Sequence, residues 1–539
     1  MKTIHKLLAC LLCLSAFALC ACDDSAFESM NTNSKKPSNV DPNYQLTQCE
    51  AQIWGFWLYH ETTLNYVSPF CQYLMGNWAT TTYGGRYAKH PQYMGSIYDY
   101  MYVLTLKNLV DIVNRTSNTK QRNLHYIARI FKVYCFGIVT DLYGDVPYFE
   151  ACRGHFDDNV LPTFDKQQDI YKDFMSELQT AVDSLRANEK TKVTGDIIYD
   201  GDILKWKRLA NSLHLRYAMR MVKADPAFAK QEVSKALHNP DGLISSAEEE
   251  ALVKYVYDSF DWETMEYRRN GIALLMKGTG EYPQTFICST FFNQLKDTND
   301  PRLFVYCRTY DETSPNNPFG RHDITEDMLS SPKAKFQPVD PGYFSWEVWP
   351  SGYWSSKMQK YYSKECRPQV NNFYLQPTSP GVIMTFAETK LLEAEAVARW
   401  GSEMSSQTVE QLYGEGVKAA FHHLESYGAK AFKDADIDTY IAANNVSADQ
   451  KDQIEKINMQ LWILHFDNPW EGYANWRRVD YPELKSSTEY GAKCLNSQTI
   501  PLRLCYPLFE GTYNKAKYEE VLQRLGGTDD WNKPVWWDQ

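Results

Sequence analysis

Apolar side chains recur at helical spacing over many stretches of this chain, and this pattern constrains the fold more than any other feature. Between Ile127 and Ile138 they fall at i, i+3, i+4, i+7, i+8 and i+11, which places them on one helical face. Asp202 precedes another such stretch as an expected N-cap, and Gly144 and Gly401 stand where helices are expected to end. The pattern predicts a mainly α protein. The expected helices cover residues 46–75, 96–114, 127–138, 170–185, 206–220, 383–399, 409–427 and 451–466.

The N-terminus has the pattern of an export signal. Lys2 and Lys6 precede an apolar run of 13 residues at 7–19, which is too short to span a bilayer that needs about 20 helical residues. Small residues then lead to Cys22, as in a bacterial lipobox, where the cysteine is acylated and becomes the first mature residue. A plain signal peptide that contains Cys22 is the alternative. We therefore expect a signal peptide at 1–21, a lipidated flexible tether at 22–45 and one large body at 46–539.

Composition and motif searches exclude several classes of protein. The chain has 67 acidic and 56 basic residues, a net charge of −11, which disfavours a nucleic-acid partner. Beyond the N-terminal run there is no apolar stretch of membrane-spanning length. H-E-x-x-H, G-x-S-x-G, P-loop and G-x-G-x-x-G motifs are missing, and the scattered cysteines lack metal or redox spacing. We expect no cofactor or metal, and no motif indicates an enzyme, although two glycosidase carboxylates could lie among the 67 acidic residues without a sequence signal.

Aromatic residues make up 14% of the chain, and those outside the expected helices gather in three segments, 77–87, 260–268 and 343–354. Each segment mixes flat rings with Asn, Asp, Glu, Ser or Arg. A sugar-binding surface needs both an apolar plane for the pyranose ring and fixed polar groups for the hydroxyls. The alternative is that these rings only pin the loops to the scaffold. The candidate ligand contacts are Trp78, Tyr83, Arg86, Trp262, Tyr267, Trp346, Trp349 and Tyr353.

Several short stretches, in order and over nearly the whole mature chain, resemble the SusD/RagB family of Bacteroidetes surface lipoproteins. The first of them, D-L-Y-G-D-V-P-Y, follows the helix around Phe131. Any one stretch is weak evidence, whereas the ordered set together with a lipobox is strong. The matching stretches are residues 141–148, 201–206, 211–216, 300–302, 384–388, 393–396, 476–478, 500–503, 506–507 and 535–538.

The resemblance implies a scaffold of helix pairs like tetratricopeptide repeats, with long irregular loops that carry the ligand site. It implies a non-enzymatic lipoprotein at the outer membrane, facing the cell exterior, that captures oligosaccharides and delivers them to a SusC-like TonB-dependent transporter. A loop after the first helix pair, as at 77–87, often supplies ligand aromatics in the family. Two alternatives stay open: an oligopeptide-binding, RagB-like member of the same family and, less in keeping with the sequence, a secreted hydrolase.

The matched motifs themselves are better explained by packing than by ligand binding. Trp206, Trp476 and Trp536 are expected in the core, because buried Trp is more common than an exposed ligand platform. The charged motif residues are expected to pair internally with carboxylates such as Glu388 and Glu395. His422 and His423 lie on a polar helix and are expected to be solvated. The arginines concerned are Arg216, Arg220, Arg477, Arg478 and Arg503.

Overall fold

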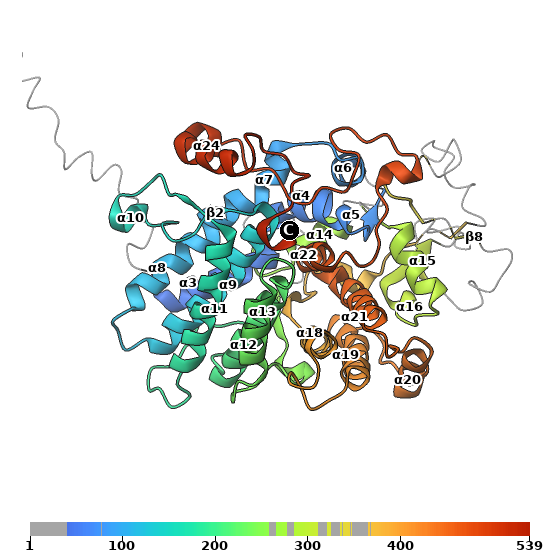
Figure 1. The fold of residues 1–539 in the computed structure, drawn as a ribbon, viewed down its shortest axis with the longest axis horizontal. Coiled ribbons are helices and arrows are strands. Elements are labelled where there is room, and N and C mark those ends of the chain that lie inside the picture. The colour runs from blue at the N-terminus through green and yellow to red at the C-terminus, as the bar shows by residue number, and fades with distance from the viewer. Residues whose placement is uncertain are drawn as a thin grey trace, which may run out of the picture.

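Helices joined by irregular segments build the molecule (Figure 1). In this computed structural model, helices hold 59% of the residues and strands 5%. The mainly α fold class is therefore confirmed. The structure describes residues 40–76, 78–257, 266–277, 285–310, 321–324, 335–336, 338–344, 347, 365–366 and 368–539.

Long helices form the scaffold in two stacks. The first stack consists of α8 (Lys107–Thr116), α9 (Arg122–Tyr143), α11 (Gln167–Ser184), α12 (Ile203–Arg220) and α13 (Pro226–Leu237). The second consists of α18 (Phe386–Trp400), α19 (Val409–His423), α21 (Gln450–Leu464) and α22 (Pro469–Val479). Each helix packs on the next in its stack, and α12 packs on α18 to join the two. Stacked helix pairs of this kind are the tetratricopeptide-like arrangement that was predicted.

Shorter helices and small sheets close the ends of the scaffold. The helices are α3 (Pro42–Gly55), α4 (His60–Thr62), α5 (Ser68–Phe70), α6 (Trp78–Thr80), α7 (Pro91–Tyr100), α10 (Gly154–Asp157), α14 (Gly271–Lys277), α15 (Ser289–Asp297), α16 (Leu303–Tyr306), α20 (Asp434–Ala443), α23 (Glu510–Tyr513) and α24 (Lys515–Arg524). Among π-helical turns, η2 (Thr63–Val67) follows α4, η3 (Thr81–Gly85) follows α6 and η4 (Met101–Leu106) joins α7 to α8. The 3-10 turns are η1 (Trp57–Tyr59), η5 (Ala247–Glu249), η7 (Asn372–Leu375), η8 (Leu424–Tyr427), η9 (His465–Asp467), η10 (Ser487–Tyr490) and η11 (Trp536–Asp538).

The strands are short and pair across long sequence distances. Antiparallel pairs join β1 (Leu74–Met75) to β5 (Phe286–Ile287), β2 (Val146–Pro147) to β3 (Phe164–Asp165), and β4 (Ala251–Val253) to β11 (Gly381–Met384). A three-stranded sheet has the order β10 (Gln369–Val370), β6 (Cys307–Tyr310), β7 (Arg321–Asp323). Parallel strands β8 (Lys335–Phe336) and β9 (Glu365–Cys366) complete the set. These strands tie irregular segments to the helices and form no continuous sheet layer within the described residues.

Most predicted helices are found near their expected positions, but the predictions missed α13, α20, α22 and α24, and one predicted helix near the N-terminus is wrong. Asp202 caps α12 by accepting hydrogen bonds from the backbone N–H groups of residues 204 and 205, at 3.0 and 3.2 Å. The prediction of one helix over 46–75 is wrong, because the chain is extended at Phe56 and reaches residue 70 through short α, 3-10 and π turns. The first helix also begins earlier than expected, at Pro42, with Asp41 as its N-cap. Residues 42–45 therefore belong to the helical body.

Motif arginines pair with buried carboxylates between helices, as predicted, both across the two stacks and within the second stack. Arg216 on α12 donates to both carboxylate oxygens of Glu388 on α18, each at 2.6 Å. Arg478 makes the same two-bond contact with Glu395, again at 2.6 Å. Burial raises the pKa of the Glu395 carboxyl, but the Arg478 and Arg399 charges outweigh it and lower the pKa to about 2. Each pair fixes one helix against another.

Two of the remaining motif arginines also pair with carboxylates, whereas the third does not. Arg220 donates to Glu471 at 2.5 Å, and Arg503 donates to Asp529 at 2.8 Å. Arg477 departs from the prediction, because it donates to the backbone carbonyls of residues 141 and 502, at 2.8 and 2.9 Å. Trp206 and Trp476 are buried as expected, whereas Trp536 is half-buried.

His423 is not solvated, so that prediction is wrong. Its ring lies between two acids, with Glu250 2.7 Å from Nδ1 and Asp467 3.1 Å from Nε2. Burial lowers the pKa of the imidazole, but the two carboxylates outweigh this effect and raise it to about 10. His422, the preceding residue, faces outward and contacts Glu425. The helix places the two histidines on different sides. Nothing in the local sequence indicated that distant acids would contact His423.

The cysteines of the described residues form no disulfide. As expected, most are buried free thiols: Cys49, Cys71, Cys135, Cys288, Cys307 and Cys505 are buried, and Cys152 and Cys494 are half-buried. In the same part of the chain, no group of three or more His, Cys, Asp or Glu side chains is placed to hold a metal ion. Nor does any described helix have the length and apolar character needed to cross a membrane.

Candidate functional site

Two of the three aromatic segments lie against each other in the structure, although about 260 residues separate them. The Thr81 hydroxyl, at the start of η3, donates to the backbone carbonyl of Tyr343 at 3.0 Å. Gly76 forms a β-bridge with Phe344, and residue 289 donates to the carbonyl of Val339 at 2.9 Å. We call residues 76–87, 338–347 and 486–496 the loop platform, of which the structure describes all but residues 77, 345 and 346.

Arg86 is the main polar link within the loop platform. Its Nε donates to the carbonyl of Gly342 at 2.8 Å, and its terminal nitrogen contacts both carboxylate oxygens of Glu347, at 2.6 and 2.7 Å. The guanidinium also lies over the Phe344 ring, 4.5 Å from its centroid. The two charged side chains are 22% and 34% exposed, so the pair stays accessible from solvent. Arg86 thus positions the third aromatic segment against the first.

Residues 486–496 form the third part of the platform and contact the other two parts mainly through backbone groups. Residues 495 and 496 donate to the carbonyls of Arg86 and Tyr87, at 2.8 and 3.0 Å. The Tyr343 hydroxyl donates to the carbonyl of residue 490 at 2.9 Å. Gly342 has φ of +80°, and a Cβ there would lie 2.5 Å from the Cβ of Ala492. Only glycine fits this crossing.

Tyr83 lies mostly inside the molecule. It is 8% exposed, and its ring packs against Tyr66, His90 and Tyr93, with centroid distances of 5.9, 5.2 and 5.1 Å. Burial raises the pKa of its phenol, with a smaller contribution from Tyr93. Only an edge of the Tyr83 ring is left to face a ligand, so the prediction for this residue narrows to an edge contact.

Tyr267, the described member of the second segment, occupies a different position. It is half-buried at the end of α3, with its ring centroid 6.0 Å from that of Phe56. The backbone of α3 passes so closely that a Cβ on Gly55 would lie 2.6 Å from the Tyr267 carbonyl oxygen. Beside it, Arg268 pairs with Glu266 at 2.5 Å. This segment is held to α3, whereas the first and third segments are held to each other.

The other predicted contacts are placed only in part. Trp78 is the first residue of α6, and the structure describes its backbone alone. Among the remaining candidates, the following lie outside the described residues: Cys22, Trp262, Trp346, Trp349 and Tyr353. Sequence reasoning missed Glu347 and Gly342, since neither is aromatic and each acts through Arg86.

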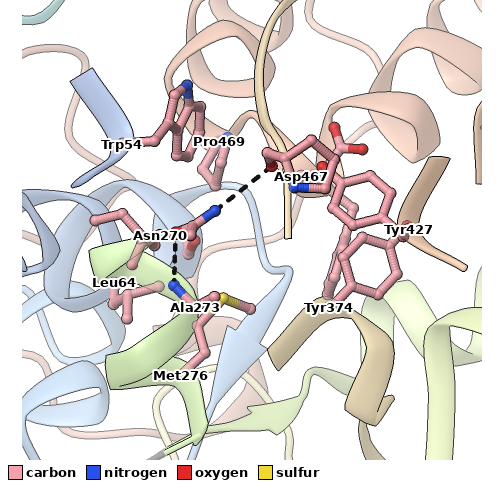
Figure 2. Close-up of a pocket in the computed structure, with 13 residues that line it drawn as sticks. Trp54, Leu64, Asn270, Ala273, Met276, Tyr374, Tyr427, Asp467 and Pro469 are labelled. Carbon is pink, nitrogen blue, oxygen red and sulfur yellow. Dashed lines mark hydrogen bonds between the residues drawn. The ribbon is translucent and has the colours of Figure 1, made fainter. Parts of the chain in front are cut away.

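A small internal cavity lies near the second segment, and Figure 2 shows its lining. Its volume is about 30 Å³, enough for a single water. Asn270 caps α14 by accepting from the N–H of Ala273 at 2.9 Å and donates toward the carbonyl of Pro380 at 3.4 Å (Figure 2). Trp54 and Tyr374 line other sides of the cavity, and both are buried. This cavity is a packing gap in the core and is too small for an oligosaccharide.

Comparison with known proteins connects this geometry to a family. The profile of a SusD-like family described as "Starch-binding associating with outer membrane" matches residues 35–507. The chain belongs to this SusD-like family. No curated protein sequence matches the chain.

Solved structures of SusD-like proteins agree with the fold over 93% of this chain. One described as Bacteroidetes AC2a SusD-like is 34% identical, covers 93% of this chain and 100% of its own, and has a TM-score of 0.83. A chitin-binding protein is 32% identical over the same shares, with a TM-score of 0.78. A SusD homolog from Bacteroides uniformis is 22% identical, covers 93% and 100%, and has a TM-score of 0.72, which shows the shared fold alone. The family predicted from the sequence is confirmed.

Proposed function

We propose that this SusD-like protein captures an oligosaccharide at the cell surface and delivers it to a partner TonB-dependent transporter of the outer membrane, without catalysis. The observation that carries the proposal is the contact between the first and third aromatic segments, held by Arg86 and Glu347. This contact supports the proposal because it joins the described parts of two segments that each mix flat rings with polar groups, through an ion pair that is partly exposed. Rings that stack on pyranose faces, with polar groups for the hydroxyls, are what an oligosaccharide site requires.

The first ligand class to test is the β-linked N-acetylglucosamine oligomer. A relative that is 32% identical over its full length is a chitin-binding protein, and the family description names starch. We assign the ligand contacts to Trp78, Trp346, Trp349 and Tyr353, with an edge of Tyr83. Arg86 holds the platform together and is expected to contact ligand only with its exposed edge.

Attachment to the membrane is assigned to Cys22. The described body offers no helix long and apolar enough to cross a bilayer. An N-terminal acyl anchor followed by a short tether would hold it at the outer membrane, and several acyl chains anchor far more firmly than one. A Cys22→Ala variant should appear in the soluble fraction when cells are fractionated. Its persistence in the membrane fraction in the absence of the transporter would overturn the anchor.

Titration calorimetry of the mature, unlipidated protein tests the ligand class. Chitin oligomers, malto-oligosaccharides and unrelated oligopeptides are compared at equal concentration. Trp78→Ala is expected to weaken glycan binding at least tenfold, about 1.4 kcal/mol. Tyr513→Ala, which removes an aromatic ring that is 73% exposed on α23, is the matched control and should bind as the wild type does.

Each alternative function has its own outcome in this experiment. Peptide binding without glycan binding would favour the oligopeptide-binding alternative and overturn the glycan proposal. Chromatography of the oligosaccharide after long incubation checks for cleavage. Shortened products that vanish on mutation of one carboxylate would establish a hydrolase instead.

A further inference from the structure

A second, larger cavity lies away from the loop platform. It is a groove of about 1110 Å³ between the turn η4 with α8 on one side and residues 147–162 with α10 on the other. Glu510 of α23 closes one end, and Val40, where the described chain begins, lines it as well. In Figure 1, α8 and α10 lie at the opposite end of the molecule from α15 and α16.

An apolar rim surrounds this groove. Of the eleven large hydrophobic residues that are exposed in the described part of the chain, eight belong here, and only Leu204, Val256 and Leu495 lie elsewhere. Of these eight residues, Val103 and Val160 line the groove itself. Tyr513 stacks on Phe509, and each of the remaining residues lies within two positions along the chain of a lining residue. Concentrated exposed apolar surface marks an interaction site, whereas scattered single residues do not. The apolar rim consists of Tyr44, Val103, Phe149, Val160, Leu161, Leu508, Phe509 and Tyr513.

The acids that line the groove are Asp99, Asp111 and Glu510, and the bases are Lys107, Arg115 and His155. Arg115 donates to Asp111 at 3.3 Å and to Gln45 at 2.9 Å. Near α23, Glu510 accepts from the Tyr98 hydroxyl at 3.0 Å, and no described residue forms an ion pair or hydrogen bond with Asp99. Burial and the neighbouring Glu510 raise the pKa of Asp99 to about 6, and burial raises that of Glu510. A positive charge from outside would relieve both carboxyls.

The groove also lies beside the first residues that the structure describes. Val40 lines it, and Asp41 caps α3 directly afterwards. Cys22, the assigned lipid attachment site, is 18 residues earlier, a distance the chain can span with at most about 60 Å of extended backbone. Under the proposed anchor, the groove that Val40 lines is therefore separated from the lipid by no more than this length of chain.

We propose that the apolar rim and the Asp99–Glu510 end of the groove form the docking surface for a membrane-embedded partner protein, which inserts a segment carrying Lys or Arg between apolar side chains. This rests on the proposed function, which supplies such a partner in the transporter. A flat bilayer would leave the groove unfilled and press two carboxyls against lipid. An inserted polypeptide segment instead fills the groove and neutralises the acids, while its apolar side chains cover the rim.

The test uses the tagged, lipidated full chain expressed in its own host. Outer membranes are dissolved in mild detergent, and the TonB-dependent transporter that co-purifies is identified and quantified by mass spectrometry. Leu508→Asp with Phe509→Asp places charges on the rim at positions 70% and 61% exposed, so folding is preserved. Leu204→Asp with Val256→Asp, at positions 44% and 78% exposed elsewhere, is the matched control.

The rim variant is expected to recover at least tenfold less transporter, with glycan binding unchanged, and the control is expected to match the wild type. Asp99→Asn with Glu510→Gln should lower recovery and reduce its sensitivity to salt. Full recovery by either variant overturns the docking surface. Loss of wild-type binding to phosphatidylcholine vesicles in the rim variant, with transporter recovery intact, would assign the rim to lipid instead. If the wild-type chain binds glycan but recovers no transporter, delivery to a transporter and docking of that transporter at the groove are both wrong, while glycan capture still stands.

Discussion

The ion pair between Arg216 and Glu388 offers a sharp test of how the two helix stacks are joined. The side chains are 2% and 1% exposed, and two hydrogen bonds of 2.6 Å connect them. Glu388→Gln keeps the shape of the side chain but removes its charge. The NH2 group of the glutamine then faces the guanidinium, and both groups are hydrogen-bond donors. The Arg216 charge therefore stays buried without the carboxylate that neutralised it.

The expected loss of stability follows from this geometry. Removing one member of a buried pair costs about 3–5 kcal/mol. We expect the lower end, about 3 kcal/mol, because the Glu471 carboxylate still lies 3.6 Å from Arg216 Nε. With an unfolding entropy of about 2.1 cal/mol/K per residue and about 440 described residues, each kcal/mol shifts the Tm by about 1 °C. Glu388→Gln should therefore lower the Tm by about 3 °C.

Differential scanning calorimetry at pH 7 measures this shift. Glu519→Gln is the control, since its contact with Lys515 is 3.6 Å long and both side chains are more than half exposed. An exposed pair contributes less than about 1 kcal/mol, so the control should melt within about 1 °C of the wild type. Equal shifts for the two variants would refute the argument from burial.

The pH dependence gives a second check on the same pair. Burial raises the pKa of Glu388, but the Arg216 charge outweighs it, so the folded pKa lies below the ordinary value of 4.5. The stabilisation from ionised Glu388 is thus present above pH 4.5 and is lost as the pH falls below it. The Tm difference between wild type and Glu388→Gln should shrink from pH 5 to pH 3, and a difference that grows on acidification would contradict the assignment.

Two further predictions concern His423 and Gly342. His423 has a folded pKa of about 10 between Glu250 and Asp467, so its stabilisation is complete below pH 6.5 and is lost as the pH rises through 10. The Tm gap between wild type and His423→Gln should therefore be largest near pH 6 and close by pH 10.5 in thermal melts. Gly342→Ala forces a Cβ to 2.5 Å from Ala492 at φ of +80°, a strain of about 1–3 kcal/mol. Calorimetry should show glycan affinity reduced several-fold, and unchanged affinity would separate the loop platform from the ligand site.

Local sequence pattern located several of the long helices, although it missed α13 and α22, which also pack into the core. The apolar spacing around Phe131 located α9, and Asp202 marked the start of α12. It failed where tertiary contacts override local preference. The first helix ends at Gly55, where the chain lies against the backbone of Tyr267, a contact across more than 200 residues.

The candidate site could be predicted only as separate pieces. Composition identified the aromatic segments, since rings outside helical periods stand out. Nothing in the sequence indicates that Arg86 meets Glu347, because residues 261 positions apart carry no local signal. His423 illustrates the same limit in the core, since its acidic partners Glu250 and Asp467 lie 173 and 44 positions away.

The family motifs are uninformative about the ligand for a structural reason. Asp141, at the end of α9, accepts hydrogen bonds from the Tyr171 hydroxyl and from Trp537 Nε1, the latter at 2.9 Å. Its backbone carbonyl accepts from Arg477 at 2.8 Å, and Arg503 donates to the carbonyl of residue 143 at 3.1 Å. Motifs from the first third and the last tenth of the chain thus meet in one buried cluster. Substitution in this cluster would disturb the packing of α9, α12 and α22 together. The loop platform lies outside the cluster and is held by backbone hydrogen bonds and a solvent-accessible ion pair. The scaffold can stay fixed while the platform side chains change, so ligand specificity must be sought in the loops.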